Sequence, residues 1–364
     1  MRIMRRFTRS TPGTTMIAVA AARAAATALA TAVVATSLAG CSSPAAAPTG
    51  VTVVTHDSFA VPDDVLAAFE AESGLTVTFV APGDAGALVN QLILTKDAPL
   101  GDVVYGIDNS FASRAIDEAI FVDYASDAPA AADADAYAIP DSTALTAIDY
   151  SDVCINVDHR YFASRGLAEP VTLEDLAQPS YEGLLSVTNP ATSSPGLAFV
   201  LATVAAYGDA WPDYWARLRA NGLRVTASWT DSYYSDFSGP SSGGAYPLVL
   251  SYASSPPYEV GEDGVAPTGA LLDTCFRQVE YAGVLKGAGN PDAAKQVIDW
   301  MLSDAFQTAL PENMYVYPVS STVTVPPEWA ANAPLSARPY TLDPATITAH
   351  RDEYIRTWTS VVLD

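Results

Sequence analysis

The sequence predicts an α/β protein built as two lobes, and two observations support this prediction. Runs rich in β-branched residues alternate with amphipathic helical runs from Val51 onward, which is typical of a parallel sheet with right-handed crossovers. The stretch from about Val51 to Asp364 is also long for a single hydrophobic core, so a division into two lobes is expected.

The first forty residues are predicted to be a signal peptide. Four early arginines precede an Ala-rich apolar run at 24–38, which is too short for a comfortable membrane span. The letters LAGC at 38–41 resemble a lipobox, in which Cys41 becomes a lipidated N-terminus; the alternative is a chance cysteine after an ordinary signal. Residues 41–50, poor in bulky apolar groups, are then a tether that holds the protein on the outer face of a membrane.

The chain beyond the signal is strongly acidic. The signal holds five of the 18 Lys and Arg residues and none of the 41 Asp and Glu residues, so 13 basic residues face 41 acidic ones, a net charge of −28. Such a surface argues against nucleic acid as a partner and attracts a cationic ligand.

Three strand–helix pairs open the fold. Strands are predicted at 51–59, 75–83 and 101–108, and helices at 62–74, 84–99 and 110–121. Pro62 suits the first turn of its helix, Asp63 and Asp64 suit the positive end, and Gly74 ends it. Ligands of such sheets gather beyond the carboxyl ends of the strands, and polar residues follow all three strands: His56-Asp57-Ser58, Gly83-Asp84-Ala85-Gly86 and Asp108-Asn109-Ser110.

A second unit begins with the strand near 145–158. Further strands are expected at 223–229, 246–252 and 275–289, helices at 195–207 and 213–222, one long helix at 290–310, and an amphipathic helix near 344–363. The hydroxyls of Thr192, Ser193 and Ser194 precede Pro195, which opens a helix, so they form either an anion site or an ordinary N-cap.

Seven aromatic residues lie close to predicted element ends: Trp229, Tyr233, Tyr234, Tyr252, Tyr258, Tyr315 and Tyr317. Together they could stack a flat ring or enclose a cation, at roughly 0.5–2 kcal/mol each, although each one alone is better explained as the edge of the core. The letters GPSSG at 239–243 match a nucleophile pattern, but they lie in a polar loop that leads into a strand. No zinc cluster or phosphate loop is present, so the sequence predicts no enzyme, metal site or cofactor.

Nine segments, in order, resemble the thiamine-binding proteins of bacterial thiamine ABC transporters: THDSFA, GDAGALVNQLILTK, DVVYGIDN, DYSDVCINVD, NPATSSPGLAF, SWTDSYYSDF, PLVLSYASSPPYEV, FRQVEYAGVLKG and YVYPV. The resemblance implies a Venus-flytrap fold of the periplasmic-binding-protein type, with hinge strands between two lobes. It implies lobe 1 at 51–146 plus about 272–312, and lobe 2 at 147–271 plus about 313–364. It also implies a monomer that hands thiamine, or a thiamine phosphate, to a membrane permease.

The resemblance also implies roles for single residues. Trp229, Tyr252 and Tyr258 match aromatics that sandwich the ligand rings. Tyr315 falls where some relatives have tryptophan, and His56 where relatives often have tyrosine. The complete predicted ligand-binding set is His56, Asp57, Asp84, Gly86, Asp108, Asn109, Ser193, Trp229, Tyr233, Tyr252, Tyr258 and Tyr315.

Within this set, Asp57, Asp84 and Asp108 lie near the positions of the thiazolium and aminopyrimidine, Ser193 near the hydroxyethyl or phosphate tail, and Gly86 where backbone approaches closely.

Two cysteines remain after Cys41. An isolated pair outside the cytosol suggests one disulfide, the alternative being two buried thiols. Because hinge strands run side by side in the resembled fold, the resemblance implies a Cys154–Cys275 disulfide at the hinge.

Three alternative functions remain open. A ferric-ion or polyamine binder of the same fold is one, since Tyr233-Tyr234 is similar to the paired tyrosines of ferric-binding relatives. An exported hydrolase that uses Ser241 is the second, and a sensor or adhesin that has lost its ligand is the third.

Overall fold

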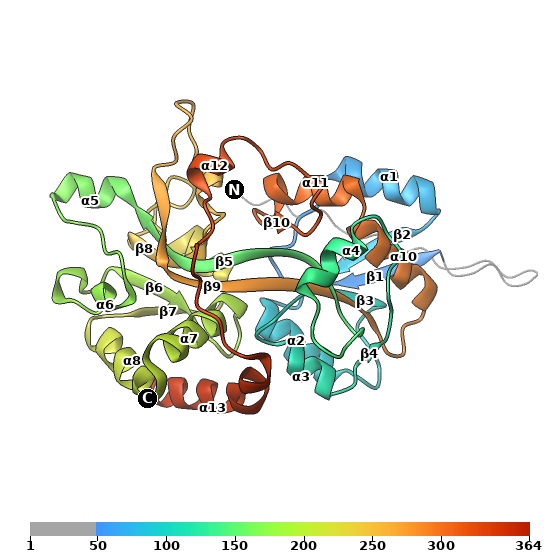
Figure 1. The fold of residues 1–364 in the computed structure, drawn as a ribbon, viewed down its shortest axis with the longest axis horizontal. Helices are drawn as coiled ribbons and strands as arrows, with labels where there is room; N and C mark the ends of the chain where they lie inside the picture. The colour runs from blue at the N-terminus through green and yellow to red at the C-terminus, as the bar shows by residue number, and fades with distance from the viewer. Residues whose placement is uncertain (1–48) are drawn as a thin grey trace, which may run out of the picture. The chain divides into compact units, whose positions relative to one another are not determined.

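Strands from distant parts of the chain form one ten-stranded mixed sheet, in the order β2-β1-β3-β9-β5-β8-β6-β7, with β10 on β5 and β4 on β9 (Figure 1). This computed structural model describes residues 49–364, which belong to one compact unit that starts at Ala47. The predicted signal at 1–40, Cys41 and the predicted tether up to residue 48 lie outside the described residues. No helix of the described part is long and apolar enough to cross a membrane.

The half of the sheet that contains β2, β1 and β3, here called the first side, has the predicted strand–helix alternation. Strands β1 (Gly50–Val54), β2 (Thr76–Val80) and β3 (Val103–Asp108) are parallel, and α1 (Asp63–Ser73), α2 (Ala85–Leu94) and α3 (Ala112–Asp117) alternate with them. Gly74 ends α1 with a left-handed backbone, φ 70°, and its N–H donates to the Glu70 carbonyl. Strand β1 starts at Gly50, the last residue of the predicted tether.

Two long antiparallel strands cross the middle of the sheet. Strand β5 (Thr146–Asp158) pairs with β9 (Thr268–Leu285), and this register places Asp149 opposite Glu280 (Figure 1). Strand β9 starts seven residues before the predicted 275, because its first part also pairs with β5. A disulfide joins Cys154 on β5 to Cys275 on β9, which is the pairing that the resemblance implies.

The other half of the sheet, here called the second side, contains β6 (Leu185–Thr188), β7 (Arg224–Thr226) and β8 (Leu248–Tyr252). Strand β6 is parallel to both neighbours, and β8 is antiparallel to β5. Helix α7 (Ser194–Tyr207) is buried over its first ten residues, all of which are apolar or small. Helices α5 (His159–Arg165), α6 (Leu173–Leu176) and α8 (Trp211–Ala220) complete this side.

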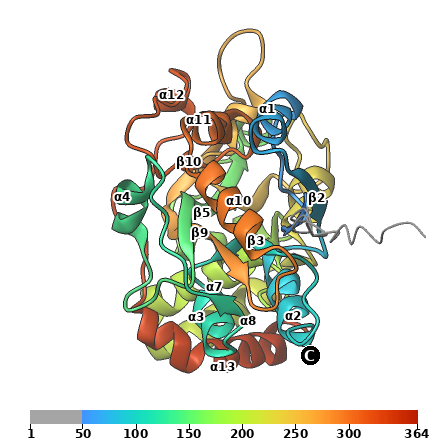
Figure 2. The ribbon, with the colours of Figure 1, turned by 90° about the vertical axis from the view of Figure 1, so that its right-hand side faces the viewer.

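The single long helix predicted at 290–310 is wrong, because the structure has two helices there. Helix α10 (Pro291–Met301) ends before Ser303, whose side chain accepts the N–H of Phe306 and starts α11 (Asp304–Asn313). A serine inside a helical pattern thus acts as an N-cap. Helix α10 lies across the face of β3 and β9 (Figure 2).

The C-terminal segment returns across both sides. It contains β10 (Tyr317–Pro318), α12 (Trp329–Asn332) and α13 (Pro344–Val362), while β4 (Phe121–Val122) and α4 (Ala131–Ala134) belong to the first side. Helix α13 contacts α7 and α8 from the second side and α3 from the first. Its Trp358 is fully buried and meets Trp215 edge-on, while the Arg351 guanidinium lies over the Phe111 ring.

Candidate functional site

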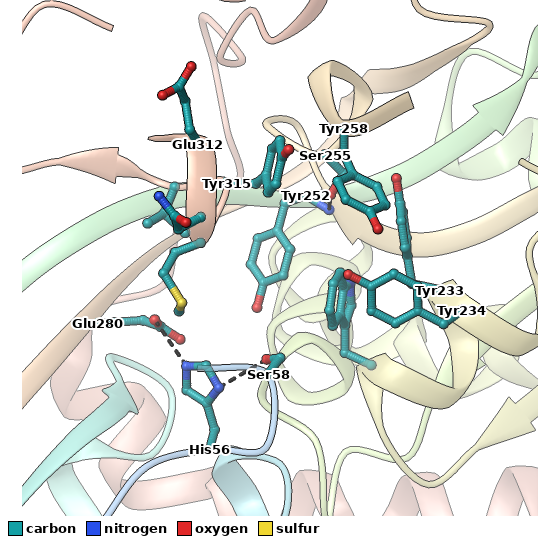
Figure 3. A pocket seen from close by; sticks show the side chains of 14 residues that line it. His56, Ser58, Tyr233, Tyr234, Tyr252, Ser255, Tyr258, Glu280, Glu312 and Tyr315 are labelled. Carbon is teal, nitrogen blue, oxygen red and sulfur yellow. Dashed lines mark hydrogen bonds and ion pairs between the residues drawn. The ribbon is translucent and has the colours of Figure 1, made fainter. Parts of the chain in front are cut away.

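A pocket lies where the carboxyl ends of the first-side strands face the loops of the second side (Figure 3). Five chain segments line it: His56 and Ser58 after β1, Trp229 to Tyr234, Tyr252 to Tyr258, Glu280 on β9, and Glu312 to Val316 at the end of α11 and just beyond it. Six of the twelve residues predicted to bind ligand are therefore in one pocket: His56, Trp229, Tyr233, Tyr252, Tyr258 and Tyr315.

Aromatic side chains form one wall of this pocket. The Trp229 ring, on α9 (Trp229–Asp231), stacks on Tyr233 with centroids 5.1 Å apart and an angle of 18°. Tyr234 stands nearly perpendicular to both rings, and Tyr258 is edge-on to Tyr315 at 5.1 Å (Figure 3). The faces of such electron-rich rings attract a flat cation. We call Trp229, Tyr233, Tyr234, Tyr252, Tyr258 and Tyr315 the aromatic wall.

The local sequence positions two of these rings. Strand β8 ends at Tyr252, and the Ser255 hydroxyl accepts the backbone N–H of Tyr252 at 3.3 Å. The chain then turns through a short 3-10 helix, Pro256–Glu259, which carries Tyr258 back toward the pocket. Because proline restricts the backbone, the turn is rigid and the ring loses little freedom when a ligand binds.

Tyr315 is held by an uncommon backbone conformation. Its φ is 53°, in the left-handed region that side chains other than glycine rarely adopt. Its N–H donates to the Leu310 carbonyl at 3.1 Å, so the end of α11 stabilises the conformation. The turn directs the ring toward Tyr258 (Figure 3).

A buried acidic cluster lies opposite the aromatic wall. Glu280 is 3.6 Å from Nε2 of His56, and the Tyr105 hydroxyl is 3.1 Å from Glu280 and 2.6 Å from Asp149. Burial lowers the pKa of His56, but the attraction of Glu280, with that of Asp84 and Asp57, outweighs burial, and the net pKa shift is upward. Burial, followed by repulsion from Glu280, raises the pKa of Asp149 well above its ordinary value.

Glu280 was missed by the sequence reasoning. It is the acidic residue of an otherwise apolar run, VEYAGVL, in a strand that lies at the centre of the sheet. Burial of a carboxylate in such a strand costs free energy unless the carboxylate has partners. A glutamate in this apolar run therefore indicated a functional or paired residue.

Asp84 connects the two sides at a smaller cavity beside the pocket. Its carboxylate caps α2 by accepting the Ala85 N–H at 2.6 Å, and it also accepts the N–H groups of Ser194 and Trp229 at 3.3 and 2.9 Å. Burial raises the pKa of Asp84, and the N–H of Trp229 opposes this rise. The structure thus gives Asp84 three backbone donors from both sides of the sheet.

Gly86 and Ser193 mark the contact between the start of α2 and the loop before α7. A Cβ on Gly86 would lie 2.7 Å from the Thr192 carbonyl carbon, and Ala87 donates its N–H to the Thr192 oxygen at 3.0 Å. Ser193 is fully buried next to this contact, and it is its neighbour Ser194 that lines the smaller cavity.

Five of the twelve predicted residues lie outside the linings of the pocket and the smaller cavity: Gly86 and Ser193, at the contact described above, and Asp57, Asp108 and Asn109. Asp108 is fully buried, accepts hydrogen bonds from Ser110 and Ser194, and has its pKa raised by burial to about 6. The Asn109 side chain bonds the backbone of β9, donating to the Arg277 carbonyl. Asp57 is exposed, and its N–H donates to the Gly83 carbonyl.

Comparison with known proteins places the chain in a family. Residues 98–347 match the family model described as bacterial extracellular solute-binding protein. The thiamine-binding periplasmic protein of Escherichia coli K12 is 30% identical over 88% of this chain and 96% of that protein. The Brucella suis protein of the same name is 28% identical over 88% of this chain and 94% of its own length.

Comparison with solved structures indicates the same family. A structure titled periplasmic thiamin binding protein superposes with a TM-score of 0.75 and 29% identity, covering 86% of this chain and 96% of that one. Iron-bound HitA from Pseudomonas aeruginosa, at 20% identity and a TM-score of 0.69 over 86% of this chain and 99% of that one, shares the fold. The chain belongs to the bacterial extracellular solute-binding proteins, a non-enzymatic family, and is a homologue of the thiamine-binding periplasmic proteins.

Proposed function

We propose that the protein binds thiamine, or a thiamine phosphate, in the pocket between the aromatic wall and Glu280 and delivers it to an ABC permease. The observation that carries this proposal is the pairing of stacked aromatic rings with a buried carboxylate across one cavity. Thiamine is flat, aromatic and permanently cationic, so its rings match the aromatic faces and its charge matches Glu280. The names of the relatives support the same ligand.

The strands β5 and β9 are the proposed hinge. Lobe 1 at 51–146 plus about 272–312 and lobe 2 at 147–271 plus about 313–364 meet within these two strands. A ligand that contacts both lobes stabilises the closed arrangement, because only that arrangement provides both sets of contacts. The tail of the ligand is proposed to reach Ser193 and the start of α7.

The proposal includes a lipid anchor at Cys41 and delivery as a monomer. A Cys41→Ser variant is expected to leave the membrane fraction and to lose labelling by a radioactive fatty acid. Membrane association unchanged in this variant contradicts the anchor and leaves the ligand proposal intact.

Calorimetry tests the ligand. The purified protein is titrated with thiamine, its mono- and diphosphate, ferric ion and spermidine. Thiamine or one of its phosphates is expected to bind with a submicromolar Kd and to raise the melting temperature as mass action requires. Binding of iron or spermidine alone, with no response to thiamine, would replace this function by the alternative within the same fold.

A further inference from the structure

The pair formed by His56 and Glu280 is placed where the positive charge of a ligand would lie. Both residues line the pocket and both are buried, with Nε2 of His56 3.6 Å from Glu280. Nε2 has no hydrogen-bond partner, whereas Nδ1 is 2.9 Å from the Ser58 hydroxyl (Figure 3). The imidazole therefore presents one unused nitrogen to a carboxylate inside the pocket.

The surrounding fold holds this imidazole in place. Gly106 interrupts β3 with a φ of 93°, and a Cβ there would collide with the His56 ring. Strand β3 also shifts its register against β9 at this point, between Tyr105 and Ile107. The glycine and the irregular strand together leave the space that the imidazole fills.

The cluster behind Glu280 leaves one negative charge facing the pocket. A single Tyr105 hydroxyl lies between Asp149 and Glu280, and its one proton serves one carboxylate at a time. Two buried carboxylates that share a hydroxyl repel each other's charge, and burial followed by this repulsion raises the pKa of the fully buried Asp149. The raised pKa favours a neutral Asp149, which leaves Glu280 as the carboxylate at the pocket.

Several titratable groups on neighbouring elements surround His56 and Glu280. Around His56 they are Asp57, Asp84, Tyr105 and Glu280, and around Glu280 they are His56, Tyr105, Asp108, Asp149 and Tyr252. Apart from His56, each of these groups is an acid or a phenol. A proton on His56 is therefore the one positive charge that these groups can place beside Glu280.

We propose that the positive ring of the ligand replaces the His56 proton beside Glu280, so that binding releases a proton. This inference rests on the proposed function, and it assigns Glu280 as the residue that recognises the ligand's charge. A protonated His56 would repel a fixed cation placed at the same carboxylate, whereas loss of its proton leaves the charge of the pocket unchanged. The released proton passes to the solvent buffer.

The pH dependence follows from the direction of the His56 pKa shift. Glu280 raises this pKa in the free protein, and a bound cation lowers it. Protonated His56 thus opposes binding below the raised pKa, and this opposition disappears as the pH rises through it. The Kd for thiamine is expected to fall by at most about tenfold per pH unit and then become constant.

Titration calorimetry with thiamine between pH 5.5 and 8.5, in pairs of buffers with different ionisation enthalpies, tests the inference in the wild-type protein. Near the His56 pKa the observed heat is expected to change with the buffer, as release of up to one proton requires. Binding of thiamine with no proton release and a constant Kd overturns the inference and leaves the proposed function standing. No thiamine binding at any pH overturns both.

Variants assign the effect to the pair. In His56→Gln, proton release and the pH dependence of the Kd are expected to disappear, while any titration of thiamine itself remains. Glu280→Gln is expected to raise the Kd about 10- to 100-fold at pH 8, since a charged hydrogen-bonding group is lost. His159→Gln is the matched control, because His159 is half-exposed and pairs with Glu169 outside the pocket. Unchanged proton release in His56→Gln contradicts the assignment.

Discussion

Single side chains of the aromatic wall differ in what they contribute. Tyr233 is buried, stacked under Trp229 and packed on Phe237, so it supports the other rings. Tyr258 is 42% exposed and meets Tyr234 and Tyr315 nearly at right angles without stacking on either ring, so much of its surface faces the pocket or solvent. Removal of Tyr258 is therefore the cleaner test of ligand stacking.

Tyr258→Ala is expected to raise the Kd for thiamine by about tenfold, since a ring–cation contact contributes roughly 0.5–2 kcal/mol. Tyr258→Phe keeps the ring and is expected to bind as the wild type does. Tyr161→Ala, on α5 outside the pocket, is the control for removal of a partly buried tyrosine. Calorimetry gives the Kd, and circular dichroism checks the fold; equal Kd values in Tyr258→Ala and wild type would exclude Tyr258 from the binding surface.

The place of a residue in the chain did not reveal the contacts of its side chain. The strand-end rule placed His56, Asp84 and Asp108 at one edge of the sheet, where polar residues that follow parallel strands gather. It did not distinguish Asp108, which bonds Ser110 and Ser194 beneath the pocket, from His56, which lines it. The direction of a side chain depends on contacts that residues distant in sequence provide.

Among the secondary-structure elements, the long strands β5 and β9 connect the two sides. Strands β5 and β9 belong to both predicted lobes, and the Cys154–Cys275 disulfide joins them where both side chains are fully buried. The bridge closes a loop with a sequence separation of 121 residues. A covalent link across so long a loop restricts the unfolded chain strongly.

The double variant Cys154→Ala/Cys275→Ala is expected to lower the free energy of unfolding by about 2–5 kcal/mol. Urea denaturation followed by tryptophan fluorescence measures this change. Thiamine affinity is expected to change far less, because neither cysteine lines the pocket. Thiol counting on the unfolded, non-reduced wild-type protein is the companion measurement: two free thiols would contradict the disulfide.

The whole described unit is organised around contacts between its two sides. Asp84 accepts N–H groups from Ser194 and Trp229, and Ala87 donates to the Thr192 carbonyl. All of these contacts join the start of α2 to the second side, next to the pocket. Under the proposed closure, they stabilise the ligand-binding arrangement.

Gly86→Ala tests this role. The added methyl would lie 2.7 Å from the Thr192 backbone, so we expect the two sides to separate there and the Kd for thiamine to rise about tenfold or more. Gly50→Ala is the matched control, because a Cβ on Gly50 meets nothing within 4 Å. Calorimetry gives the Kd and small-angle scattering the compactness of the free protein. A Kd in Gly86→Ala equal to that of Gly50→Ala would contradict the role of this contact.

The amino-acid order was sufficient to predict the alternation of strands and helices, the aromatic positions and the pair of cysteines. These features depend on local periodicity, turn residues and composition, which neighbouring residues reveal. The break at Ser303 and the cluster of His56, Tyr105, Asp149 and Glu280 were decided by the tertiary structure. Asp149 lies on β5, Glu280 on β9, Tyr105 in β3 and His56 two residues after β1. The register of pairing between these distant strands, which no local pattern encodes, brings the four residues together.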